Sequence, residues 1–497
     1  MKSKISIWFT VLALALVSCL KNEIVYNTDD IDFRGWSFAA PIARVHAPAY
    51  ESMKKWVDFD SITYNSEGVI CVVYTHSEKI NWNDQISIDD YRSQGWKYDL
   101  KPTTLTETYP IRLTTSDGEP DSYVDYAKLT GGKLDLSFNV PGGISWEVEV
   151  TIPELKKNGV PFRSTFNRMM TGINLSSLDG YEINTVSKNM NMKCTFTGSS
   201  ASGTVNMNFN LSDLDVQYMT GYFGQPKQHL DNTKMDFNFS YDLDFLGSFG
   251  FKDLELKAEL LNPVGVPANL KANSIRFANG YGLNQKVNTD PPLNFNVNAA
   301  GGDIYHVIPV NNLLKTKLSL EFEQANYPEM LILDLEGTAN PAGECPNFIV
   351  NDEELYTKVD LTLTIPLHVY VNNFHRKDTV DFDYNDLVNG YDKHVKNIEK
   401  FTIKLTVDNR LPFDVQLTTD AIDGALNNVE KEFAKATIEA KKDKQVVIIT
   451  LTQKQIENFR TKNVKYLVFH SNAQTEKKEY KKVYKDDYLD INVSVSF

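Results

Sequence analysis

Hydrophobic and polar residues alternate one by one along much of this chain. In the stretch 133–140 the apolar residues are Leu134, Leu136, Phe138 and Val140, and every residue between them is polar. The same alternation recurs in segments 204–211, 234–243, 317–322, 358–365 and 490–497. A period of two gives each strand one apolar and one polar face, which is typical of antiparallel sheets that cover a core on one side. We therefore predict a mainly β protein of tandem antiparallel β-sandwich-like domains with few short helices.

Helical patterns are sparse. In Pro48–Val57, Tyr50 and Met53 lie on one stripe with Trp56, and in 451–460 Thr452 stands as an N-cap before the apolar positions of a short amphipathic run. The sequence predicts short helices at these two places.

One structural unit occurs twice. Leu254–Leu270 and Phe401–Leu417 each consist of an alternating strand, an Asn, a Val-Pro or Leu-Pro pair and a second extended run, and they begin 147 residues apart. Proline has no N–H to donate to a sheet, so Pro267 and Pro412 are each expected at an edge, at a bulge or where the chain switches between sheets. The repeat predicts two related β domains.

Chain length and pattern suggest several units. The residues after position 18 are enough for about three domains of ~100–200 residues. The predicted division is a signal segment (1–18), a lipidated Cys with its tether (19–34), an N-terminal mixed β domain (35–130), a first sandwich-like domain (131–285) and a second one with a C-terminal hairpin (286–497).

The N-terminus carries a secretion pattern. Lys2 and Lys4 precede an apolar run, Ile5–Val17, that is shorter than the ~20 residues needed to span a bilayer. The run ends in Leu-Val-Ser-Cys, which resembles the lipobox of bacterial lipoproteins. The resemblance implies cleavage before Cys19, a thioether-linked diacylglycerol on its sulfur and an acylated amino group, with palmitate as a typical chain. Such acyl chains anchor a protein in a membrane at ~0.8 kcal/mol per buried CH₂.

Three further segments resemble a recurrent group of large outer-membrane lipoproteins of Bacteroidota whose function is unassigned. They are "AAPIARVHAPAYESMKKW" with the following "ITYNSEGVICVVYTHS", the strand–Asn–Pro units, and the C-terminal "VKYLVFHSNAQT" to "YLDINVSVSF". Glu23, shortly after Cys19, resembles the surface-export signal of such lipoproteins, which favours the cell surface over the periplasm. The resemblance implies an anchor and a β architecture, and it brings no activity and no site residue.

Charge and cysteine content narrow the function classes. Removing residues 1–18 takes away two lysines and moves the formal net charge from −14 to −16. This acidic balance disfavours a nucleic-acid partner, because nucleic-acid binding requires a basic surface. After Cys19 the chain has Cys71, Cys194 and Cys345, so at most one disulfide can form, and buried free thiols are an equal alternative.

A calcium loop is the sharpest metal candidate. In the segment 381–392, oxygen-bearing side chains fall at offsets 1, 3, 5, 9 and 12, at Asp381, Asp383, Asn385, Asn389 and Asp392. Ca²⁺ takes six to eight oxygens, and alternating positions of a tight loop converge on one point. Asp386 stands where such loops have glycine, so the alternative is a strand or turn with its acidic residues in solvent.

A glycan contact is the candidate for ligand binding. Tyr222 and Phe223 lie between glycines in "TGYFGQPKQH". Exposed aromatic faces stack on sugar rings, but glycine-flanked aromatics also plug the end of a sandwich core.

No catalytic motif is present: the sequence has no HExxH, GxSxG or phosphate-binding loop. We therefore predict a membrane-anchored envelope lipoprotein that acts as a non-catalytic binding or structural module for a glycan or an envelope protein. Two alternatives stay open. One is a glycan-processing hydrolase, whose carboxylate pair has no linear signature. The other is a lipid-carrying β tube.

Overall fold

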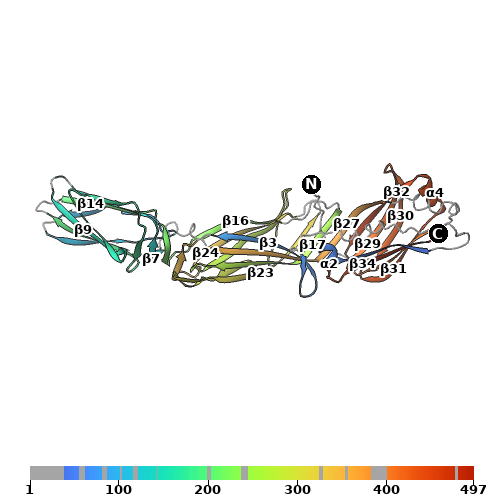
Figure 1. The fold of residues 1–497 in the computed structure, drawn as a ribbon, viewed down its shortest axis with the longest axis horizontal. Coiled ribbons are helices and arrows are strands. Elements are labelled where there is room, and N and C mark those ends of the chain that lie inside the picture. The colour runs from blue at the N-terminus through green and yellow to red at the C-terminus, as the bar shows by residue number, and fades with distance from the viewer. Residues whose placement is uncertain are drawn as a thin grey trace.

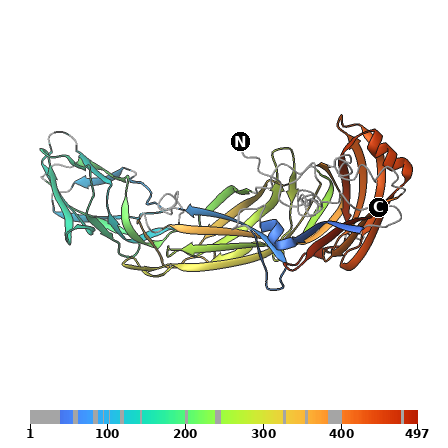
Figure 2. The same ribbon diagram turned by 45° about the vertical axis from the view of Figure 1, so that its right-hand side comes forward.

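The computed structural model describes residues 39–54, 62–80, 87–93, 95–100, 103–115, 121–140, 142, 144–198, 203–236, 245–323, 328–352, 356–381, 400–475 and 479–496. The chain is mainly β, and its helices are short. Three β bodies follow one another along the long axis, as Figures 1 and 2 show from two directions. We call them the distal sandwich, the central body and the terminal body. The predicted fold class is confirmed.

The distal sandwich consists of two antiparallel sheets. The larger sheet contains β25 (Asn347–Val350), β15 (Val216–Tyr222), β7 (Tyr123–Leu129), β12 (Tyr181–Asn184), β9 (Trp146–Lys157), β13 (Met190–Gly198) and β6 (Leu105–Ile111), with β10 (Val160–Asn167) paired to β9. The smaller sheet contains β11 (Gly172–Leu175), β8 (Lys133–Asn139), β14 (Gly203–Ser212) and β4 (Tyr91–Arg92), with β5 (Trp96–Leu100) paired to β14.

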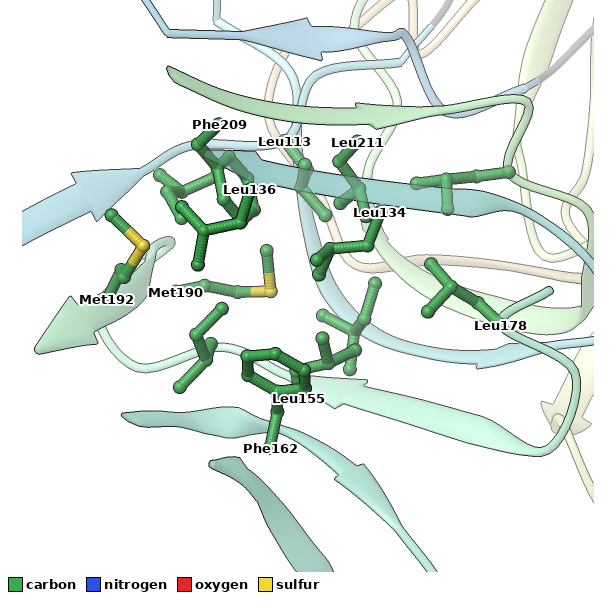
Figure 3. Close-up of a cluster of buried hydrophobic side chains, with 14 of the residues drawn as sticks. Leu113, Leu134, Leu136, Leu155, Phe162, Leu178, Met190, Met192, Phe209 and Leu211 are labelled. Carbon is green, nitrogen blue, oxygen red and sulfur yellow. The ribbon is translucent and has the colours of Figure 1, made fainter. Parts of the chain in front are cut away.

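Apolar side chains from both distal sheets meet between them. Figure 3 shows Leu134, Leu136 and Phe209 of the smaller sheet facing Leu155 and Met190 of the larger one, and all five are buried. The polar residues between them along each strand face outward, as the period of two requires.

The central and terminal bodies share one large sheet. Its strands are β2 (Ile62–Tyr64), β3 (Ile70–Ile80), β26 (Thr357–Pro366), β17 (Phe245–Asn262), β27 (His368–Asp381), β32 (Val464–Gln474), β29 (Asp414–Asp423) and β30 (Asn428–Ile438), with β23 (Val310–Glu323) on β17 and β33 (Lys481–Lys482) on β27. The first half of β17 pairs with β27 and the second half with β26, so one strand runs from one body into the other.

A separate cover sheet packs on each half of the shared sheet. The central cover sheet contains β16 (Lys227–Asp236), β24 (Met330–Ala339), β18 (Ala268–Ala278), β19 (Asn284–Lys286) and β20 (Asn294–Val297). The terminal cover sheet contains β1 (Ala39–Pro48), β34 (Tyr488–Ser496), β28 (Phe401–Asn409) and β31 (Lys442–Leu451). A small hairpin, β21 (Gly301–Asp303) and β22 (His306–Ile308), precedes β23.

Both predicted helices are present. Helix α2 covers Ala49–Lys54 and helix α4 covers Gln453–Thr461. The Thr452 side chain accepts a hydrogen bond from the Gln455 N–H, and the Gln455 side chain bonds back to the Thr452 backbone, which is a capping box. Ile456 and Phe459 bury the inner face of α4 against the end of the terminal body.

The first copy of the repeated unit turns around a buried asparagine. Asn262 ends β17 and is 1% exposed. Its Oδ1 accepts the Val264 N–H at 3.2 Å, and its Nδ2 donates to the carbonyls of Val266 at 3.3 Å and Asn298 at 2.8 Å. After Pro267 the chain enters β18 and so passes from the shared sheet into the central cover sheet.

The second copy repeats this arrangement. Asn409 ends β28 and is fully buried. Its Oδ1 accepts the Leu411 N–H at 3.0 Å, and its Nδ2 donates to the carbonyls of Phe413 at 3.1 Å and Glu439 at 3.0 Å. After Pro412 the chain passes from the terminal cover sheet into β29 of the shared sheet. Of the three positions expected for the prolines, an edge, a bulge or a switch between sheets, the structure shows the switch in both copies.

Strands from the predicted range 35–130 take part in all three bodies. Within it, β1 lies in the terminal cover sheet, β3 in the shared sheet and β7 in the distal sandwich. The predicted boundaries at 130 and 285 concern independent folding units and stay predictions.

Candidate ligand-binding edge of the distal sandwich

Most of the predicted calcium loop lies outside the described residues, as does Cys19. Asp381 is the last residue of β27, where its backbone pairs with Tyr466, while Asp383, Asn385, Asn389 and Asp392 fall in the stretch that is not described. The calcium site and the lipidation therefore stay predictions. Within the described ranges, no group of three or more His, Cys, Asp or Glu residues is placed to hold a metal ion.

Tyr222 and Phe223, the predicted glycan contacts, are buried. Tyr222 is 5% exposed and Phe223 is fully enclosed in the distal core. The Tyr222 ring lies 6.1 Å from the ring of Tyr123, and the Phe223 N–H donates to Oδ1 of Asn347 at 3.1 Å. In this structure neither ring presents a face to solvent, which is the condition for stacking on a sugar.

Phe223 belongs instead to the joint between the distal sandwich and the central body. There Asn340 and Asn347, 1% and 2% exposed, exchange two side-chain hydrogen bonds of 2.8 Å. Asn340 also donates to the Gly224 carbonyl at 2.6 Å, and Asn347 donates to that of Gly265 at 3.3 Å. Three separate chain segments are thus held together by buried amides, which makes the joint a packed connection.

Two edge strands face each other across the open side of the distal sandwich. In the smaller sheet β5 pairs with β14 and places Trp96 and Tyr98 opposite Met207 and Val205, both fully buried. In the larger sheet β6 is the last strand. Directly paired residues share a face of a sheet, so the side chains of Trp96 and Tyr98 point inward.

On β6, Glu107 and Tyr109 also point inward. Glu107 pairs with Cys194 and Tyr109 with Met192, and both partners are fully buried. Glu107 and Tyr109 themselves are half-buried, on the last strand of the larger sheet. Burial raises the pKa of Tyr109 to about 12, with smaller contributions from neighbouring acidic groups.

A row of half-buried aromatic rings lines this edge. The ring of Trp96 lies 4.8 Å from that of Tyr109 and 6.4 Å from that of Tyr91 on β4. On the core side Trp96 and Tyr91 both pack against Phe209, at 6.2 and 6.0 Å. Phe209 is 1% exposed, so the row is seated on the core, and Tyr91 and Trp96 are themselves half-buried.

Tyr98 carries a buried hydroxyl that lacks a partner. Its ring stacks on Phe196 with 5° between the planes, and the side chain is 7% exposed. Among the described residues no group hydrogen-bonds to the hydroxyl. Burial first, and then the negative charge of Glu107, raise the pKa of Tyr98. We call Trp96, Tyr98, Glu107 and Tyr109, together with Tyr91, the edge site.

A second aromatic group lies at the joint with the central body. Tyr126 and Tyr218, on the outer face of the larger distal sheet, have ring centroids 5.8 Å apart, and the Tyr218 ring lies 5.7 Å from that of Tyr305 at the tip of the β21–β22 hairpin. These ring contacts link the central body to the distal sandwich, so they brace the joint.

The three cysteines after Cys19 are free thiols in this structure. Cys71 on β3 and Cys194 in the distal core are 1% and 0% exposed, and Cys345 is half-buried at the joint. The Cys345 Sγ–H donates to Oδ1 of Asn340 at 3.2 Å.

No family model matches this sequence, and no curated protein is similar to it. Among solved structures, one from Parabacteroides distasonis, described as a candidate secreted protein, aligns over 93% of this chain and 99% of its own at 11% identity and a TM-score of 0.29. A structure of infectious bursal disease virus aligns over 85% and 81% at 10% identity and a TM-score of 0.13. At these scores neither likeness carries an argument. Within the described residues, no helix has the length and apolarity to cross a membrane.

Sequence reasoning missed the edge site because its residues are recognisable only when the inward face of each strand is known. Glu107 occupies a core-facing position of an alternating strand, "LTETYPI", in which Ile111 is buried. A charged residue at such a position is a usable signal, but only once the inward face of the strand is known.

Proposed function

We propose that this protein is a lipid-anchored lipoprotein of the bacterial cell envelope that acts as a non-catalytic binding or structural module. The observation that carries the proposal is the place of the first described strand. The first described residue, Ala39, pairs with Ser496 in the terminal cover sheet, at the opposite end of the molecule from the distal sandwich. A tether from Cys19 therefore reaches the body at one end and leaves the distal sandwich farthest from the anchor.

The connections between the bodies support a role in which the distal sandwich is held away from the membrane. β17 runs from the terminal into the central body, and the buried Asn340–Asn347 pair fastens the central body to the distal sandwich. A chain of bodies joined by continuous strands and packed amides resists folding back on itself. It presents the loops and edges of its outermost body to the surroundings, where binding residues of sandwich domains lie.

Replacing the lipidated thiol tests the anchor. In Cys19→Ser the thioether cannot form, so we expect incorporation of labelled palmitate to disappear and the protein to leave the membrane fraction. Ser18→Ala, a small residue kept next to the thiol, is the matched control. Continued sedimentation of the Cys19→Ser protein with membranes, without label, would refute the anchor.

A separate experiment tests on which side of the outer membrane the distal sandwich lies. Met169 is 98% exposed in the loop between β10 and β11, so a specific protease site inserted after it is accessible. We propose that the protein faces the outside of the outer membrane, and cleavage on intact cells is then expected. Cleavage only after the outer membrane has been permeabilised would place the protein in the periplasm.

The non-catalytic part of the proposal has its own test. The solubilised protein is incubated with neutral polysaccharides and with peptides, and the products are analysed. No turnover is expected. Hydrolysis that is abolished by a single acidic-to-amide substitution would establish the hydrolase in place of the binding module.

A further inference from the structure

We propose that the edge site binds the polyhydroxylated ring of a neutral saccharide. The rings of Trp96 and Tyr109 would contact one side of the saccharide, and the polar groups of Tyr98 and Glu107 would contact its hydroxyls. The inference rests on the proposed function, because it names the ligand class and the site of the binding module. None of these residues is needed for the anchor.

The argument begins with the two unmatched polar groups. The Tyr98 hydroxyl has no hydrogen-bond partner among the described residues and is covered by its neighbours, so a ligand that bonds to it must displace one of them. A buried hydroxyl without a partner is destabilised, so a ligand group that bonds to it gains more there than at an exposed hydroxyl. Within the described chain Glu107 likewise forms no ion pair or hydrogen bond, although it is half-buried.

The two groups are complementary to a ligand that carries adjacent hydroxyls. The Glu107 carboxylate only accepts hydrogen bonds, while the Tyr98 hydroxyl donates one and accepts others. A pair of neighbouring hydroxyls can donate to the carboxylate and still accept from the tyrosine. Hydrogen bonds to a charged acceptor are stronger than bonds between neutral groups.

The aromatic row supplies the apolar part of the site. Tyr91, Trp96 and Tyr109 are half-buried, and their adjacent centroids are 6.4 and 4.8 Å apart. A saccharide ring has C–H groups on its faces and hydroxyls around its rim, so it matches a line of rings that borders buried polar groups. The alternative ligand is a compact cation, which needs only one carboxylate and one open ring face. In this row Trp96 is stacked on Tyr109 and Phe209, so the rings form a line and not one isolated ring face.

The experiment uses the detergent-solubilised full chain. Binding is measured by microscale thermophoresis against neutral oligosaccharides built from glucose, mannose, galactose and N-acetylglucosamine, with tetramethylammonium as the cationic probe. Lipopolysaccharide from the same cells forms a separate arm and distinguishes an envelope glycan from a free one. The variants are Tyr98→Phe, which keeps the ring on Phe196, and Glu107→Gln, which keeps the shape. Glu147→Gln, an exposed carboxylate on β9, is the matched control.

At least one saccharide is expected to bind. Tyr98→Phe should weaken its affinity about three- to tenfold and Glu107→Gln about ten- to a hundredfold, while Glu147→Gln leaves it unchanged. The proposal is overturned if no saccharide binds, if both variants bind like the unchanged protein, or if only tetramethylammonium responds to Glu107→Gln.

A second measurement needs no variant. Crystals of the unchanged protein soaked with the saccharide that binds best should show it between Trp96 and Glu107, and water alone at that place would overturn the proposal. Failure here is distinguishable from failure of the anchor, because Cys19→Ser changes fractionation and leaves saccharide binding intact.

Discussion

Asn409→Ala should loosen the turn between β28 and β29 strongly, although it removes only a small polar side chain. The asparagine is fully buried and makes three hydrogen bonds, all to backbone groups. Alanine fits the same space and cannot replace any of them. The repeated unit therefore predicts that stability at this turn depends on one amide.

The magnitude follows from the surroundings of the three bonded groups. Leu411 is 4% exposed, so its N–H is left unpaired in the core, at about 1–3 kcal/mol. The carbonyls belong to Phe413, which is half-buried, and to Glu439, which is exposed, so water can reach them. Each of these two bonds then contributes about 0.5–1.5 kcal/mol. Together these contributions span about 2–6 kcal/mol. Because water can reach both carbonyls, we expect a loss near the lower end, about 3 kcal/mol, which is still among the larger effects of single substitutions.

Hydrogen exchange followed by mass spectrometry measures the loss of stability at the turn itself. For a chain of several bodies this is more informative than a single global unfolding transition. At about 1.4 kcal/mol per tenfold change, protection in peptides that cover β28 and β29 should fall about a hundredfold. Asn262→Ala, which removes the same bonds in the first copy, should do this for β17 and β18 and leave β28 unchanged. Asn174→Ala, an exposed asparagine of the distal sandwich, is the surface control.

Equal exchange in Asn409→Ala and Asn174→Ala would refute the reasoning, because the buried amide would then not hold the turn. Loss of protection at both turns in either variant would show that the two copies do not act independently.

Three further outcomes are expected. Gly265→Ala would place a Cβ 2.1 Å from the Phe348 ring, so the free energy of unfolding should fall by about 1–3 kcal/mol and the thermal midpoint with it. Adding Phe348→Leu should restore part of that stability, and an unchanged midpoint in Gly265→Ala would argue against a tightly packed joint. In the native protein Cys345 should react with a thiol reagent well before Cys194, whose burial raises its thiol pKa to about 12; equal rates would contradict the assigned burial. The Tyr109 pKa of about 12 exceeds the value of ~10 of an unfolded chain, so stability should be unaffected below about pH 10 and fall by at most about 3 kcal/mol as the pH rises towards 12. A tyrosinate absorbance titration of Tyr109→Phe against the unchanged protein measures this.

The fold class could be predicted because alternation is a local signal. Each strand such as β8 or β14 shows its inward face in its own sequence, and the Thr452 cap marks the start of α4 without reference to the rest of the chain. The strand–Asn–Pro unit was equally visible, since the asparagine bonds to groups two and four residues further on. The partners of strands were not predictable in this way. β1 pairs with β34 across nearly the whole sequence, and β25 leaves its neighbours to join the distal sandwich.

The same distinction explains why the edge site escaped the sequence while Tyr222 and Phe223 attracted attention. Glycines around an aromatic pair suggest a loop, but here Gly221 is needed where the Tyr123 carbonyl lies 2.1 Å from an ideal Cβ, so the glycine permits close packing and buries the rings. At the edge site Trp96 and Glu107 belong to different sheets, and their encounter depends on which strands end those sheets. A feature made by the closing edges of a sandwich has no linear spacing. Its signal is a mismatch between residue type and strand face, which becomes readable only when the register is known.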